Sequence, residues 1–276
     1  MGLFDLSGKV AVVTGATKGI GFGVARQLAA HGARVVVASR SQSQCDAIAA
    51  EIERDCAAAP GMVRGVACDI DKLPDIGALA RRSLELFGGV DILVCNAAIL
   101  PFIGPSEQTP PELFDRILTT NVHHNFRLCQ AFRRSMAERG GGSIILIGST
   151  AGHTASPSIM AYSLAKAGLA HMARNLGDDL AAERIRVNCV APGFVRSYSS
   201  QPIVDNPQAV KAIADGVPLG RIGEPDDIAG AVVFLASAAG AYVTGNTILV
   251  DGGATMLSSP QLRRGIPGVE AGTSYN

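Results

Sequence analysis

The sequence lacks an excess of charge of either sign. Its 276 residues include 24 Lys and Arg and 24 Asp and Glu, so the formal net charge is zero. Nucleic acids and anionic membranes attract basic surfaces, and this balance gives no electrostatic reason to bind either. We therefore expect a small-molecule partner of little charge, with no nucleic acid and no membrane.

Long apolar runs are also missing. The longest, such as Ser143 to Ile147 and Ile92 to Cys95, fall far short of the roughly 20 residues that cross a bilayer. The N-terminus, Met1 to Gly8, lacks the basic start and apolar stretch of a secretion signal. Both absences predict a soluble protein with a cytoplasmic location.

Cysteine and histidine patterns that bind metals are absent. The six cysteines are scattered without metal-type or redox-type spacing, and several lie in apolar runs, where reduced thiols pack as small core residues. His123 and His124 are adjacent, so on a helix they point to different faces and do not form a pair of ligands. The sequence predicts no metal site.

What the sequence does have is an alternation of short β-branched runs with longer segments rich in Ala and Leu, which is typical of βαβ units. Nearly unbroken apolar runs such as Val10 to Val13 indicate strands buried on both faces. We predict an α/β fold: a Rossmann-type doubly wound seven-stranded parallel sheet with helices on both faces, in a single domain. The expected strands are 10–14, 34–38, 62–67, 91–96, 142–147, 186–190 and 247–250, and the expected helices are 21–31, 43–58, 75–87, 111–139, 161–182 and 226–236.

A glycine-rich segment follows the first expected strand and leads into a helix. Thr14 to Gly21 has the spacing GxxxGxG. Glycines let backbone amides approach a pyrophosphate, and the helix N-terminus adds partial positive charge. This setting predicts a dinucleotide site with contacts from Gly15, Thr17, Lys18, Gly19, Ile20 and Gly21.

The end of the second expected strand indicates which dinucleotide binds. An acidic residue there would hold the ribose 2′-hydroxyl of NAD, but this chain has Ser39 and Arg40. A guanidinium suits bidentate contact with the 2′-phosphate of NADP, and Lys18 adds a second positive charge. NADP (NADPH) is the predicted cofactor and NAD the alternative. A reading in which Arg40 and Lys18 are only solvated surface charges stays open.

Tyr162 and Lys166 are four residues apart, so they share one face of a helix. A tyrosine hydroxyl has a pKa of about 10, so proton exchange near neutral pH requires a group that stabilises the phenolate. A lysine ammonium one turn away would do so. The spacing alone is more often that of a packed aromatic ring beside a solvated charge.

Five motifs in order resemble the short-chain dehydrogenase/reductase family, in its single-domain, NADP-preferring branch of carbonyl and ketone reductases. The resemblance implies hydride transfer between nicotinamide C4 and a carbonyl or carbinol carbon, with Tyr162 exchanging the proton on oxygen. It implies that Ser149 holds this oxygen, that Lys166 lowers the pKa of Tyr162 and binds the nicotinamide ribose, and that Asn121 anchors a water relaying protons. The motifs are Thr14 to Gly21, Asn96-Ala97-Ala98, Asn121, Ser149 and the Tyr162/Lys166 pair.

The resemblance also implies further cofactor contacts and an assembly. Ala98 replaces a common glycine and Ser197 a usual threonine, and both changes leave the expected roles in place. The implied assembly is a homotetramer, or at least a homodimer. The implied cofactor contacts are Asp69, Ile70, Asn96, Ala97, Pro192, Gly193, Val195 and Ser197, together with Tyr162 and Lys166.

Substrate contacts are expected at Ser149, His153, Ile159 and Tyr162, although His153 fits a solvated loop equally well. The apolar content of segments 99–105 and 198–217 favours a hydrophobic or moderately sized carbonyl compound. Residues 1–257 are assigned to the catalytic domain, and residues 258–276 to a C-terminal tail that is disordered, covers the pocket or meets a neighbouring subunit.

The leading function is an NADPH-dependent carbonyl reductase, reversible as an alcohol dehydrogenase. One alternative is an NAD-dependent catabolic alcohol dehydrogenase, against which Arg40 argues. Another is a non-catalytic NADP-binding regulator, which the retention of Ser149, Tyr162 and Lys166 disfavours.

Overall fold

The computed structural model describes residues 2–100, 102–197 and 200–256. Within them, seven strands form one sheet in the order β3-β2-β1-β4-β5-β6-β7, and every neighbouring pair is parallel. The predicted doubly wound sheet is thus confirmed. The expected tail, residues 258–276, lies outside the described residues. The strands are β1 (Val10–Thr14), β2 (Arg34–Ser39), β3 (Val63–Ala67), β4 (Ile92–Cys95), β5 (Gly142–Ile147), β6 (Ile185–Pro192) and β7 (Thr247–Val250).

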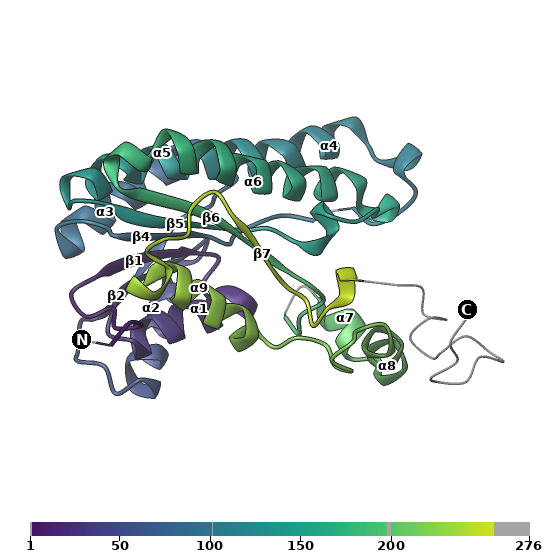
Figure 1. The fold of residues 1–276 in the computed structure, drawn as a ribbon, viewed down its shortest axis with the longest axis horizontal. Coiled ribbons are helices and arrows are strands. Elements are labelled where there is room, and N and C mark those ends of the chain that lie inside the picture. The colour runs from purple at the N-terminus through teal and green to yellow at the C-terminus, as the bar shows by residue number, and fades with distance from the viewer. Residues whose placement is uncertain (1, 101, 198–199, 257–276) are drawn as a thin grey trace, which may run out of the picture.

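Helices cover both faces of the sheet (Figure 1). One face carries α3 (Leu73–Phe87), α4 (Pro111–Leu118), α5 (His124–Glu138) and α6 (Met160–Asp179), and the other carries α1 (Gly19–Ala30), α2 (Gln42–Asp55) and α9 (Pro225–Ala236). The short helices α7 (Gln201–Val204) and α8 (Pro207–Asp215) lie off the end of the sheet toward which β7 runs. Among the described helices, none combines the length and apolar character that crossing a membrane requires.

Strand β1 shows why its sequence is an unbroken apolar run. Ala11 and Val13 face the core packed under α1 and α9, whereas Val10 and Val12 face the core packed under α3 and α5. All four side chains are 0% exposed. Because successive side chains of a strand point to opposite faces, a strand covered by helices on both sides needs apolar residues at every position.

The helical stretch expected over 111–139 contains a wider, π-helical turn. Helix α4 ends at Leu118, residues Thr119–His123 form a π turn, and α5 begins at His124. Thr120 and Asn121 in this turn are 0% exposed, and each donates a side-chain hydrogen bond to a neighbouring loop. The expected helical stretch is thus present, and the π turn inside it, which these bonds to distant segments accompany, was not predicted.

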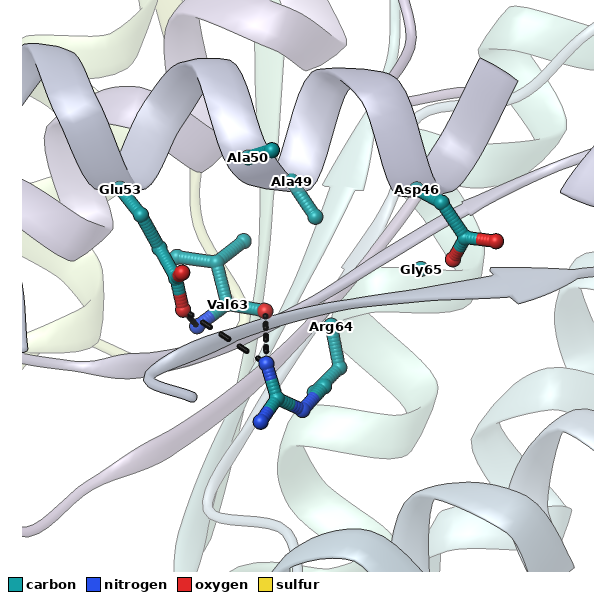
Figure 2. A pocket seen from close by; sticks show the side chains of 7 residues that line it. All are labelled: Asp46, Ala49, Ala50, Glu53, Val63, Arg64 and Gly65. Carbon is teal, nitrogen blue, oxygen red and sulfur yellow. Dashed lines mark hydrogen bonds and ion pairs between the residues drawn. The ribbon is translucent and has the colours of Figure 1, made fainter. Parts of the chain in front are cut away.

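The outer edge of the sheet, β3, is covered by side chains of α2. Gln42 Oε1 accepts a hydrogen bond from Ala67 N at 2.7 Å, and its Nε2 donates to Gly65 O at 3.0 Å. Glu53 Oε1 accepts from Val63 N at 2.9 Å. A shallow hollow of about 180 Å³ lies between these contacts, with Glu53 and Val63 on one side of it (Figure 2). The side chains take the place of a further strand, so the edge offers fewer free groups for pairing with another chain.

Candidate active site

The predicted site residues gather at the carboxyl ends of the strands. In an open α/β sheet, ligands bind at this edge, next to the point where the strand order reverses. Here that point lies between β1 and β4. The segments at this edge are Thr14 to Gly21 after β1, Ser39 and Arg40 after β2, Asp69 and Ile70 after β3, Asn96 and Ala97 after β4, Ser149 after β5, and Gly193 to Ser197 after β6.

The glycine loop after β1 has a shape that only glycine permits. Gly15 and Gly19 have φ of +64° and +57°, in the left-handed region that other residues rarely adopt. A Cβ at Gly21 would lie 2.3 Å from the carbonyl oxygen of Gly15. The loop and the first turn of α1 are therefore in direct backbone contact, as a cradle for a pyrophosphate requires.

Thr14, at the end of β1, and Asn96, just after β4, hold this loop in place. The buried Thr14 Oγ1 accepts hydrogen bonds from Asn96 N at 3.0 Å and Ala97 N at 3.1 Å. Asn96 Nδ2 donates to Thr14 O at 2.8 Å and Gly15 O at 3.2 Å. Thr14 was not among the predicted contacts. A hydroxyl at the last position of an otherwise apolar buried strand is the signal that could have identified it.

The end of β2 completes the nucleotide side of the site. Thr17 Oγ1 donates to Ser39 Oγ at 3.2 Å, which holds the glycine loop against β2. Arg40 is exposed, and its guanidinium forms no ion pair with the described residues. The first turn of α1 contains no acidic residue. A glycine cradle beside a helix N-terminus fits the pyrophosphate of a dinucleotide.

The segment after β6 is fixed by backbone contacts to its neighbours. Gly193 N donates to Val250 O at 3.0 Å, and Val195 forms an isolated parallel bridge with Gly223. Ser197 N donates to Ser200 Oγ at 2.9 Å. The structure thus places Pro192, Gly193, Val195 and Ser197 at the same edge as the glycine loop, and their contact with a nicotinamide stays a prediction.

Ser149 meets Tyr162 because the loop after β5 packs on the backbone of α6. A Cβ at Gly152 would lie 2.6 Å from Ala167 N, so only glycine allows this approach. Ser149 Oγ accepts from Ala151 N at 3.1 Å, which fixes its rotamer. The Ser149 hydroxyl also acts on the phenol of Tyr162, whose pKa it lowers.

Lys166 lies on the same face of α6, one turn beyond Tyr162. Its Nζ donates to Ile147 O at 2.7 Å and lies 5.4 Å from the centroid of the Tyr162 ring. Burial lowers the pKa of Lys166 to about 8. Burial raises the pKa of Tyr162 to about 12, although the Ser149 hydroxyl acts in the opposite direction. The lowering of the Tyr162 pKa by Lys166 that the family resemblance implies stays a prediction, and the ammonium is directed to the Ile147 carbonyl.

Asn121 is buried with its side chain on the loop after β4. Its Oδ1 accepts from Ile99 N at 2.9 Å, and its Nδ2 donates to Ile99 O at 2.8 Å. Its own carbonyl oxygen accepts from Asn125 Nδ2 at 2.7 Å. The side chain thus holds a loop of the site in place, and its part in a proton relay stays a prediction.

The remaining expected substrate contacts lie between Ser149 and Tyr162. His153 is exposed and follows the 3-10 turn Thr150–Gly152, whereas Ile159 is partly buried at the start of α6. Their contact with a substrate stays a prediction. His123 is exposed and His124 is buried, and no group of three His, Cys, Asp or Glu side chains in the described part of the chain is arranged to hold a metal ion.

Known proteins are similar to this chain over nearly its whole length. A family model described as enoyl-(acyl carrier protein) reductase matches residues 15–255. Dehydrogenase/reductase SDR family member 4 of Bos taurus is 40% identical over 248 residues, which cover 90% of this chain and 88% of that protein.

Two solved structures show the same fold with a nicotinamide cofactor. A gluconate 5-dehydrogenase from Burkholderia cenocepacia, in complex with NADP and tartrate, superposes with a TM-score of 0.86 at 31% identity, covering 93% of this chain and 98% of that one. A 7α-hydroxysteroid dehydrogenase complexed with NADH and 7-oxo-glycochenodeoxycholic acid superposes with a TM-score of 0.85 at 33% identity, covering 91% and 96%.

Proposed function

The chain belongs to the short-chain dehydrogenase/reductase family of oxidoreductases, and on this basis we propose that it transfers a hydride between NADP(H) and a ketone or aldehyde, or the corresponding alcohol. The observation that carries the proposal is the grouping of Tyr162 with the buried Lys166, whose Nζ lies 5.4 Å from the centroid of the tyrosine ring, and with Ser149 on the loop packed against α6. All three lie at the carboxyl edge of the sheet, where the glycine loop offers a dinucleotide cradle.

Tyr162 serves as the general acid. With a pKa of about 12 it is protonated near neutral pH, so it can donate a proton to a carbonyl oxygen as negative charge develops there. The Ser149 hydroxyl holds the same oxygen, and the Lys166 ammonium lies close enough to stabilise the phenolate that remains. The nicotinamide, when bound, supplies or accepts the hydride.

Arg40 supports NADP as the cofactor. Its unpaired guanidinium follows β2, where a carboxylate would be expected for NAD. NAD is the second candidate, since one relative of similar fold was solved with NADH. The proposed contacts with the adenosine half are Gly15, Thr17, Lys18, Gly19, Ile20, Gly21, Ser39, Arg40, Asp69 and Ile70.

Apolar side chains near the same edge support a hydrophobic carbonyl substrate. In the loop after β4, Leu100 is 40% exposed and Ile103 is 70% exposed. On the other side of the site, Ile203 in α7 is 39% exposed and Leu219 beyond α8 is 70% exposed. Exposed apolar groups near the edge where open α/β sheets bind ligands favour a ligand that covers them.

The function is tested by a panel of ketones and aldehydes of increasing apolar size, with sugar acids as polar comparators. Each compound is offered with NADPH and with NADH, and the absorbance of the reduced nicotinamide is followed. The proposal expects turnover with NADPH that rises with apolar size. Tight NADPH binding without turnover of any compound would instead favour the non-catalytic regulator.

We also propose that the chain forms a homotetramer or a homodimer. Strand β7 is the outer strand of the sheet opposite β3, and its Leu249 side chain is 43% exposed. An edge strand with exposed apolar residues gains stability when a second copy covers it. Light scattering coupled to size-exclusion chromatography measures the assembly, and a monomer at micromolar concentration would contradict it. The cytoplasmic location stays a prediction from the sequence.

A further inference from the structure

The loop after β3 is held by side chains that the predicted catalytic tetrad does not include. The carboxylate of Asp71 accepts hydrogen bonds from Arg116 Nε at 2.8 Å and from the hydroxyl of Thr120. His124 Nδ1 lies 2.6 Å from the carbonyl oxygen of Ile70, within hydrogen-bond distance. Helix α4, the π turn and the start of α5 thus each contribute one side chain to the same loop.

Within this set, the bond between Thr120 and Asp71 is the one on which the geometry depends most. Thr120 is 0% exposed, and a buried hydroxyl is costly to leave without a partner. The Arg116 side chain is 53% exposed, so water screens its ion pair with Asp71. Burial raises the pKa of Asp71, but the hydrogen bonds from Thr120 and Arg116 outweigh this effect and keep it below its usual value. The carboxylate is therefore ionised at neutral pH and accepts strong hydrogen bonds.

The residue after Thr120 faces a different loop. Asn121 binds both backbone polar groups of Ile99, in the loop after β4. The π turn is therefore fixed to the loop after β3 by one residue and to the loop after β4 by the next. A shift in the loop after β3 cannot occur without straining either the Asp71–Thr120 bond or the position of Asn121.

We propose that Asp71 and Thr120 are positioning residues that link the adenosine end of the cofactor site to Asn121. The loop they hold begins with Asp69 and Ile70, the expected neighbours of the adenine ring. Binding of the adenosine part of the cofactor restricts the motion of this loop. Through the Asp71–Thr120 hydrogen bond, it also restricts the motion of the π turn. The inference rests on the proposed nicotinamide dinucleotide function.

The test uses 2′,5′-ADP, which carries the adenosine and the 2′-phosphate but no nicotinamide. Backbone amide exchange is measured with and without it in the full chain and in two matched variants. Thr120→Val removes the hydroxyl at nearly constant volume, whereas Thr119→Val makes the same change at the exposed neighbouring position. Thr120→Ser restores the donor.

In the unchanged chain and in Thr119→Val, 2′,5′-ADP should slow exchange both in the glycine loop and in residues 119–123, by about tenfold in the latter. In Thr120→Val the slowing at residues 119–123 should be lost while that in the glycine loop persists, and Thr120→Ser should recover it. In turnover assays, Thr120→Val should lower kcat by about tenfold with little change in KM for the carbonyl compound.

Slowing at residues 119–123 that persists in Thr120→Val overturns the proposal, as does slowing confined to the glycine loop in the unchanged chain. If Thr120→Val does not fold, Asp71→Asn keeps the shape and weakens the acceptor, and it must reduce the slowing at residues 119–123; unchanged slowing overturns the proposal. A chain that binds neither 2′,5′-ADP nor 5′-ADP would contradict the proposed function itself, and the link with it.

Discussion

Lys166 donates its hydrogen bond to the carbonyl oxygen of Ile147, 2.7 Å away, in a position where its side chain is almost entirely buried. Near neutral pH the amine is charged in the folded and in the unfolded chain, and burial disfavours only the charge in the folded one. The proposed proton-transfer end of the site therefore lowers the stability of the protein that contains it.

Lys166→Met should abolish turnover and yet stabilise the fold. A lowering of the pKa from 10.5 to about 8 corresponds to about 3 kcal/mol, which removal of the amine recovers. Loss of the hydrogen bond to Ile147 lowers the unfolding free energy by about 1 kcal/mol. We therefore expect the unfolding free energy of Lys166→Met to exceed that of the unchanged chain by about 2 kcal/mol near pH 7. Urea unfolding measures the gain.

The pH dependence of this gain provides the check. Below pH 8 the burial penalty is complete, because both states are protonated; between 8 and 10.5 the folded chain has released the proton while the unfolded chain retains it, so the penalty declines as pH rises. The advantage of Lys166→Met should therefore be small near pH 10. Lys211→Met, at an exposed lysine of α8, should change stability little at either pH. An equal gain at both pH values would contradict the buried charge.

Tyr162→Phe should lower kcat by roughly 10²- to 10⁴-fold, the usual contribution of a general acid. The ring and its packing remain, so binding of NADPH should weaken by no more than the loss of one hydrogen bond, about tenfold, in calorimetric titration. Tyr242→Phe is the matched control, since Tyr242 is fully exposed. Retained turnover in Tyr162→Phe would show that another group donates the proton.

Arg40→Asp should weaken NADPH binding by roughly 10- to 100-fold, because one or two charge-assisted hydrogen bonds to the 2′-phosphate are replaced by repulsion. Binding of NADH should improve or stay the same. Arg54→Asp makes the same change of charge on an exposed position of α2 and should leave the cofactor preference intact. The ratio of kcat/KM for the two cofactors decides the matter, and an unchanged ratio would exclude the proposed contact.

Gly21→Ala should disrupt the cofactor cradle, since its Cβ would lie 2.3 Å from the carbonyl oxygen of Gly15. We expect a loss of about 1 to 3 kcal/mol in unfolding free energy, together with loss of dinucleotide binding. Gly230→Ala in α9 is the contrast: a Cβ there meets no atom within 4 Å, and the better helix propensity of alanine should add about 0.5 to 1 kcal/mol. Equal effects at both positions would argue against the close contact in the loop.

Gln42→Ala should uncover the edge of β3. The variant loses the bonds to Gly65 O and Ala67 N, so we expect a destabilisation of about 1 kcal/mol and association that grows with concentration. Gln208→Ala, at an exposed position of α8, should do neither. Light scattering over a range of concentrations distinguishes the two, and a monodisperse Gln42→Ala protein would show that the edge is protected by other means.

The central strands could be predicted from the sequence because both of their faces are buried, so β1, β2, β4 and β5 are nearly continuous apolar runs. The four-residue spacing of Tyr162 and Lys166 likewise survives as helix geometry. The π turn could not be predicted in this way. Its side chains bind segments that are distant in sequence: Thr120 binds Asp71, 49 residues away, and Asn121 binds Ile99, 22 residues away. No local sequence pattern predicts these contacts.

The electrostatics of the site could not be predicted from the sequence either. A lysine one turn from a tyrosine predicts a lowered phenol pKa, yet the direction of the ammonium depends on the carbonyl at the end of β5. Thr14 was missed for a related reason, because its hydroxyl acts on the backbone of β4, which is distant in sequence. In both cases the residue type can be read from the sequence, but the direction of its side chain depends on the folded sheet.

Gly152 also has a consequence for engineering the chain. Because its backbone contact with Ala167 already fixes Ser149 relative to α6, the stretch from His153 to Ser158 does not have to set that geometry. Its residues could be exchanged or lengthened to alter the choice of substrate while Ser149 and Tyr162 stay in register. A library confined to these six positions would thus vary specificity separately from the chemical step.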